Sequence, residues 1–201
     1  MIIDQILPDG QIVVKKIVPD LAVLDSAIVH HHDSMYQDPA QKERVEWVAK
    51  MSTGDKVIEV GTATGYVIAQ VKAQTRVGVD NNVARLLLAS MRYPEISFYY
   101  ANIFNMAPFC GQGFDCLIAT EILEHLPYDN VKHALYHCLR IAPKLVITLP
   151  IDKNVMTNPE HLWHPTMSLL AKALGDTGID THIGELDHVG DFLATVIVRR
   201  E

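Results

Sequence analysis

Short apolar runs alternate with longer amphipathic stretches along most of the chain. Val57, Ile58 and Val60 form a run typical of a strand that is buried on both faces of a sheet. The same pattern predicts strands over residues 56–60, 76–80, 96–100, 114–120 and 144–149, with helices over residues 39–52, 66–74, 83–92 and 128–140. Alternation of strands and helices is typical of an α/β fold with a Rossmann-like, doubly wound sheet.

The two ends of the chain add strands of another kind. Residues 2–6 and 12–17 are rich in β-branched side chains and flank a Pro-Asp-Gly turn, so we expect a hairpin. Residues 181–186 and 192–199 are joined by a short connection and must therefore be antiparallel. The sequence predicts a seven-stranded sheet with a C-terminal antiparallel hairpin. We expect one domain over residues 1–201, with a small N-terminal lid or substrate segment (1–37) and a cofactor-binding core (38–201).

A glycine-rich turn, Gly61-Thr62-Ala63-Thr64-Gly65, separates the first buried strand from a helix. Glycines at such a turn let a ligand approach the backbone closely. Asp80 follows Gly61 by 19 residues and ends the next strand, close to the spacing of about 20 for an acid that binds ribose hydroxyls. Glu59 suits a ligand with an ammonium group, whereas it would repel a pyrophosphate. An ordinary tight turn in an α/β sheet is the alternative.

Three segments together resemble the class I S-adenosylmethionine-dependent methyltransferases: VIEVGTATG, VGVD and FDCLIATEILEHLP. The resemblance covers about residues 56–150. The first motif of that family reads acid-x-Gly-x-Gly-x-Gly, and Glu59, Gly61 and Gly65 match it, with Ala63 in place of the middle glycine. The resemblance implies that Glu59 lies near the methionine amino group of the cofactor and that Asp80 holds its ribose hydroxyls.

The cofactor site that this resemblance implies extends over several loops that follow strands. We expect S-adenosylmethionine to be bound by Glu59, Gly61, Thr62, Gly65, Asp80, Asn81, Asn102, Ile103 and Thr120. Members of the family usually have an acid or amide near the adenine amino group, a role that Asn102 could fill through its side-chain oxygen. A turn-forming role for Asn102 is an equal alternative.

The segment after the strand at residues 114–120 carries the candidate catalytic groups. We expect His125 and Glu121 to be catalytic. His125 is the leading candidate for the base, because histidine titrates near neutral pH; a turn-capping role for His125 is the alternative. The spacing Glu121-x-x-Glu124-His125 resembles two metal-dependent branches, the O-methyltransferases of quinone biosynthesis and the small-RNA 3′-terminal ribose methyltransferases. Both are thought to place a divalent ion beside the acceptor hydroxyl. The site expectation itself includes no metal.

The loop after the predicted strand at residues 144–149 could complete such a metal site. It offers His161 or His164 as a further ligand, and Trp163 as either an aromatic wall or a core residue. Earlier in the chain, the three histidines at residues 30–32 indicate a polar loop at the rim of the pocket, with a metal site as the alternative. Tyr36 could reach the cofactor or acceptor.

Charge and composition restrict the class of acceptor and the location that we expect. The chain has 17 basic and 24 acidic residues, a net charge of −7, which argues against a long nucleic acid. It has no apolar stretch of the length that a membrane helix needs and no signal-peptide pattern at its start, and its three cysteines match no zinc pattern, so we expect a cytoplasmic protein. Methyl transfer to a small-molecule hydroxyl is the main expectation. The alternatives are methylation of an RNA 3′-terminal ribose, an NAD-dependent Rossmann oxidoreductase and a non-catalytic partner subunit.

Overall fold

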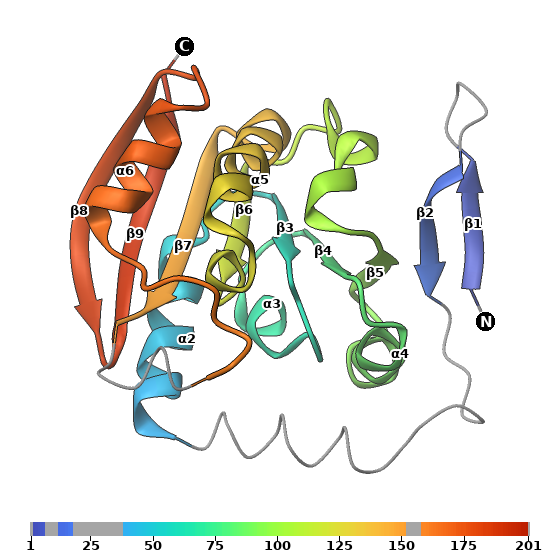
Figure 1. Ribbon diagram of the computed structural model, residues 1–201. Coiled ribbons are helices and arrows are strands. Elements are labelled where there is room, and N and C mark those ends of the chain that lie inside the picture. The colour runs from blue at the N-terminus through green and yellow to red at the C-terminus, as the bar shows by residue number, and fades with distance from the viewer. Residues whose placement is uncertain (1, 7–11, 18–37, 152–157, 201) are drawn as a thin grey trace.

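The computed structural model describes residues 2–6, 12–17, 38–151 and 158–200 of the chain (Figure 1). Its strands are β1 (Ile2–Ile6), β2 (Ile12–Ile17), β3 (Lys56–Val60), β4 (Thr75–Asp80), β5 (Ser97–Tyr100), β6 (Cys116–Thr120), β7 (Lys144–Pro150), β8 (Thr181–Val189) and β9 (Phe192–Arg199). Its α-helices are α2 (Pro39–Met51), α3 (Tyr66–Gln70), α4 (Val83–Arg92), α5 (Tyr128–Ile141) and α6 (Met167–Gly175). Short 3₁₀ turns follow β5 and β6.

The strands form one sheet in the order β1-β2-β5-β4-β3-β6-β7-β9-β8. The five central strands are parallel, and β9 runs antiparallel to both β7 and β8. The doubly wound sheet and its C-terminal antiparallel hairpin are therefore confirmed. The sheet has nine described strands, two more than expected, because β2 of the predicted N-terminal hairpin pairs with β5.

The core lies on both faces of the sheet, with helices on each side (Figure 1). Side chains alternate along β3, so that Val57 packs toward α2, α3 and α4, whereas Ile58 packs toward α5 and α6. Both residues are fully buried, which explains the continuous apolar run in the sequence. The helix expected over residues 66–74 ends at Gln70, because the chain there turns toward the start of β4.

The strand order reverses between β4 and β6, which lie on either side of β3. Ligands bind at such a switch point, beyond the carboxyl ends of the strands. The loops after β3, β4, β5, β6 and β7 all start at this edge.

Part of the N-terminal prediction lies outside the described residues, including the histidine run 30–32 and Tyr36. Of the segment proposed as a lid, the structure places only the hairpin, at the sheet edge beside β5; a covering role for residues 1–37 stays a prediction. None of the helices in the described ranges has the length and apolar character that crossing a membrane would require.

We expect Gly78→Ala to destabilise the protein. A Cβ at Gly78 would lie 2.6 Å from ring carbons of Phe98 and 2.9 Å from Thr62 Cγ2, so β4 and β5 would have to shift. Overpacking of this kind costs about 1–3 kcal/mol in the free energy of unfolding, which urea denaturation would measure.

Gly175→Ala is the matched control, because nothing lies within 4 Å of an added Cβ at this position in α6. Alanine there should leave stability unchanged or raise it by up to about 1 kcal/mol. Equal effects of the two substitutions would contradict the close packing at Gly78.

Candidate functional site

The glycine turn after β3 is held against the neighbouring strand. Gly61 N donates to Val79 O at 2.8 Å, and Gly61 has φ +74°. A Cβ at Gly61 would lie 2.7 Å from Ile122 Cδ1, so the turn passes directly under the loop that follows β6. Gly65 (φ +78°) lines neither cavity of the site, and its missing Cβ makes room for Phe98 instead. Backbone conformation and close packing explain both glycines.

Two acids hold this turn in place. Glu59 Oε2 accepts hydrogen bonds from Thr62 Oγ1 (2.7 Å) and Ile68 N (3.2 Å). Asp80 Oδ2 accepts from Ala63 N (2.8 Å), and its Oδ1 accepts from Asn82 N (2.8 Å). Both acids are buried, with 1% and 6% of their surface exposed. The acids at the ends of β3 and β4 therefore fix the shape of the loop and also line the cavities beside it.

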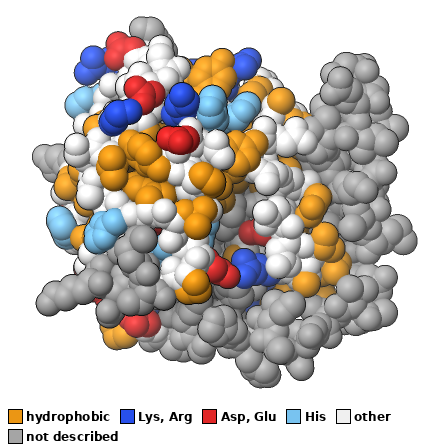
Figure 2. Space-filling model, in the orientation of Figure 1, with side chains coloured by type: hydrophobic (Ala, Val, Ile, Leu, Met, Phe, Trp, Pro, Cys, Tyr) orange, Lys and Arg blue, Asp and Glu red, His pale blue; other side chains and the backbone are white. Residues whose placement is uncertain are grey.

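Two adjoining cavities open at the carboxyl edge of the strands, of about 440 and 570 Å³. Cavities of this size accommodate small molecules. The first is lined by Asp80, Asn81, Asn102 and Ile103. The second is lined by Glu59, Thr62 and Thr120 among others. Gly61, Arg85, Glu121, His125 and Glu160 line both. Figure 2 shows a narrow hollow low on this face, with acidic and basic side chains at its edge.

The side chain of Asn102 caps a short turn of its own loop. Its Oδ1 accepts from Phe104 N at 3.0 Å and caps the 3₁₀ turn Ile103–Asn105. This is the turn-forming role that the sequence left open, and Asn102 also lines the first cavity. A carbonyl oxygen has a second lone pair, so the cap does not exclude a bond to a ligand.

Glu121 has a strained backbone at the junction of the two cavities. Its φ is +51°, which is rare for a residue with a side chain. Strain of this kind is typical of functional sites. The backbone is held by a hydrogen bond from Glu121 N to Thr148 O (3.2 Å), and Oε1 accepts from Thr148 Oγ1 (3.1 Å). Burial raises the pKa of the Glu121 carboxyl to about 7, partly offset by Arg44 and Thr148.

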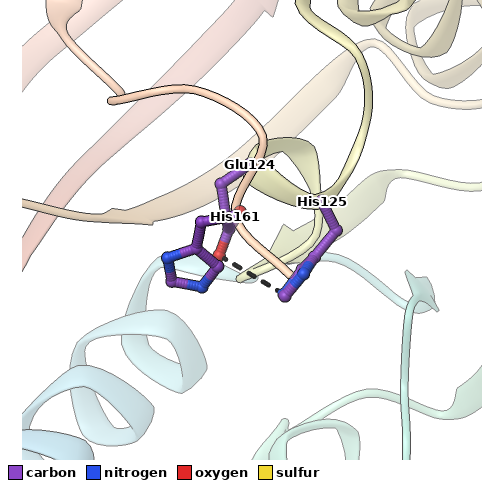
Figure 3. Close-up of side chains that lie close together, drawn as sticks. All are labelled: Glu124, His125 and His161. Atoms are coloured by element: carbon purple, nitrogen blue, oxygen red, sulfur yellow. Dashed lines mark ion pairs between the residues drawn. The ribbon is translucent and has the colours of Figure 1, made fainter. Parts of the chain in front are cut away.

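Glu124, His125 and His161 point toward one another (Figure 3). One ligand atom from each lies within 4.8 Å of the others, and His125 Nε2 is 3.9 Å from Glu124 Oε1. Glu124 is completely buried, yet neither of its carboxylate oxygens has a hydrogen-bond partner among the described residues. Burial raises the pKa of this carboxyl, and Glu121 raises it further. A buried carboxylate without a hydrogen-bond partner among the described residues, beside two imidazoles, offers ligand atoms of the kinds that divalent metals bind.

The loop after β7 brings His161 to this cluster. Leu162 N donates to Glu124 O (2.8 Å), and Trp163 Nε1 donates to Leu123 O (3.0 Å). Trp163 is buried, so of its two expected roles the structure supports the core residue that ties down the loop. His164 is exposed and outside the cluster, so the geometry selects His161 of the two candidate ligands.

No family model matches the chain, and no curated protein matches it. Solved structures do. A putative methyltransferase in complex with the Trm112 methyltransferase activator of Haloferax volcanii aligns with a TM-score of 0.70 and 17% identity, over 85% of this chain and 93% of that one. Magnesium protoporphyrin IX methyltransferase of Synechocystis PCC 6803 gives 0.62 and 16%, over 88% and 95%. The methyltransferase domain of a bacterial Hen1 gives 0.60 and 17%, over 79% and 99%.

The chain has the fold of the class I S-adenosylmethionine-dependent methyltransferases. Within this methyltransferase fold, the sequence-predicted residues other than Gly65 gather around the two cavities. Their roles toward a cofactor stay predictions.

Arg44 is one of two arginines of the site that sequence reasoning missed; the other is Arg85. Arg44 is 3% exposed, and its Nε and Nη2 donate to Gln41 Oε1 at 3.0 and 2.8 Å. Nη1 lies 3.5 Å from Thr148 Oγ1, and the guanidinium stacks 5.1 Å from the Phe192 ring centroid. A signal was present: Gln41, Arg44 and Val48 are spaced three and four apart, so an arginine interrupts the packing face of the helix.

We expect the affinity of this protein for S-adenosylhomocysteine to fall as the pH is lowered. Burial raises the pKa of the Glu59 carboxyl to about 7, partly offset by Thr62, Arg44 and Ile68 N. Below that pH the free protein holds a proton that an ammonium group must displace. Binding should weaken roughly tenfold from pH 8 to pH 6, which calorimetry would measure.

Proton release measured in buffers of different ionisation enthalpy gives a second readout. Glu59→Gln should weaken binding and remove both the pH dependence and the release. An affinity that stays constant between pH 6 and 8 in the wild-type protein would contradict the assignment of Glu59 to the ammonium group.

Proposed function

We propose that this protein transfers a methyl group from S-adenosylmethionine to a hydroxyl oxygen of a small-molecule acceptor, with a divalent metal beside the acceptor. The observation that carries the proposal is the buried Glu124 carboxylate, which has no hydrogen-bond partner within the described part of the chain and lies next to His125 and His161. The fold and the adjoining cavity for a nucleoside support the cofactor.

The cavities suit this cofactor better than a dinucleotide. We infer that Asp80 and Asn81 bind the ribose hydroxyls, that Asn102 and Ile103 contact the adenine, and that Glu59 receives the ammonium group. Gly61, Thr62 and Thr120 lie along the same path. A nicotinamide dinucleotide would place phosphates at the glycine turn, close to the buried Glu59, so the oxidoreductase alternative is disfavoured.

Glu124, His125 and His161 would hold the metal, with Glu121 at the same edge of the cavities. A bound divalent ion lowers the pKa of a hydroxyl group that it contacts and orients it. Burial lowers the pKa of the His125 imidazole, so the ring is neutral at pH 7, as a ligand must be. In this assignment His125 is a ligand rather than the base, and Glu121 takes the acceptor proton.

Methylation of an RNA 3′-terminal ribose is the second candidate. The histidine and glutamate cluster favours it, as does the likeness to the Hen1 methyltransferase domain. The net charge of −7 disfavours a long nucleic acid but not a terminal nucleotide. Incubation with labelled cofactor and matched RNA oligonucleotides that end in a 2′,3′-diol or a 3′-phosphate would test it. Only the diol offers two adjacent free hydroxyls to the metal, whereas the 3′-phosphate leaves the 2′-hydroxyl but blocks the 3′-hydroxyl. A cytoplasmic location stays a prediction.

We expect Glu124→Met to stabilise the metal-free protein while abolishing its response to metal. An apolar side chain of similar shape removes a buried, unpartnered carboxylate, which costs about 1–3 kcal/mol or more in the free energy of unfolding. Thermal unfolding with a chelator and with Mn²⁺ would measure both effects. Methyl transfer by the wild-type protein should stop on chelation and return with Mg²⁺ or Mn²⁺.

His161→Ala should lose the Mn²⁺ response, and His164→Ala is its control because His164 lies outside the cluster. If Mn²⁺ raised the melting temperature of Glu124→Met as much as that of the wild-type protein, the cluster would not be the metal site. Calorimetry with S-adenosylhomocysteine and with NAD tests the cofactor separately.

A further inference from the structure

Arg85 is a charged side chain of the site that neither the cofactor nor the metal explains. It lies in the first turn of α4 and lines both cavities. Its backbone N–H donates to Asn82 Oδ1 (3.1 Å), but its guanidinium has no hydrogen bond or ion pair with any residue that the structure describes. Arg44, by contrast, is bonded to Gln41 and close to Thr148.

The positive charge of Arg85 does not stabilise helix α4. The start of a helix carries a partial positive charge, so acidic side chains are favoured in the first turn and basic ones are not. The first turn of α4 contains no acidic residue. An arginine there adds positive charge to a helix end that already carries a partial positive charge, and the residue lines the cavities.

Arg85 stands between the two parts of the site. Asp80 lines only the first cavity, and Glu124 and His161 line only the second, whereas Arg85 lines both. His125, one of the three proposed metal ligands, lines both cavities together with Arg85. An acceptor bound at the proposed metal site would therefore lie within reach of the Arg85 guanidinium.

We propose that Arg85 binds an anionic group, a carboxylate or a phosphate, on the acceptor. This inference rests on the proposed function, because it assumes that the acceptor hydroxyl binds at the proposed metal site of Glu124, His125 and His161. Guanidinium groups bind both anions through two parallel hydrogen bonds, which suits either a small hydroxy acid or a terminal nucleotide. Glu160, on the opposite loop, lines both cavities and would repel an anion that is not held by Arg85.

Matched pairs of diols test this directly by calorimetry, in the presence of S-adenosylhomocysteine and Mn²⁺. One pair is 3,4-dihydroxybenzoate and 3,4-dihydroxybenzyl alcohol, and the other is uridine 5′-monophosphate and uridine. We expect the acid of one pair to bind about tenfold or more tightly than its neutral partner. Preference within the first pair identifies a small carboxylic acid as the source, and preference within the second identifies a nucleotide end.

Arg85→Met should abolish that preference while affinity for S-adenosylhomocysteine stays within about twofold, which also shows that the variant is folded. Arg85→Lys should retain part of the preference, and Arg140→Met, on the exposed face of α5, should retain all of it. The proposal is overturned if the wild-type protein prefers neither acid, if Arg85→Met keeps the preference, or if this variant loses cofactor affinity in parallel. Failure of the proposed function looks different, since S-adenosylhomocysteine or Mn²⁺ would then not bind to the wild-type protein.

Discussion

Burial of negative charge at the carboxyl edge of the sheet is the constraint on which the site depends. Glu59, Glu121 and Glu124 are desolvated there, and Arg44 is the buried cation that acts on all three. One guanidinium cannot compensate three carboxylates in a medium of low polarity, so burial raises the pKa of all three carboxyl groups. The metal-free, cofactor-free protein is therefore short of positive charge at this edge.

The buried acids come together because neighbouring strands of the sheet end side by side. In a parallel sheet the strand ends meet at one edge, so β3 delivers Glu59 beside the loop after β6, which carries the other two acids. Trp163 then fastens the loop after β7 to the turn at Leu123, and this contact sets His161 against the cluster. Helix α2 closes the other side, held to the last hairpin by a hydrogen bond from Trp47 Nε1 to Asp187 Oδ2 (2.7 Å).

Local pattern was enough to predict most of the fold and part of the site. Apolar runs and the glycine turn gave the strands, the closing hairpin, and the acids Glu59 and Asp80, because these features depend on neighbours in sequence. The choice of His161 over His164 could not be predicted, since it depends on how a loop docks on the turn after β6. The roles of Arg44 and Arg85 depend equally on tertiary packing, which decides whether an arginine on a helix faces solvent or a cavity.

A purely structural role does not account for Glu124. An apolar side chain of the same volume would fill the position without the cost of an unpartnered carboxylate, and buried ionic groups rarely exceed such replacements in stability. Glu59 differs, since it holds the glycine turn through two hydrogen bonds, but its raised pKa has the same origin. Cations at both places, an ammonium group and a divalent ion, would relieve the same deficit. Because Arg44 acts on the acids of both places, a cation bound at one would change the field at the other, and by linkage the effect would be reciprocal.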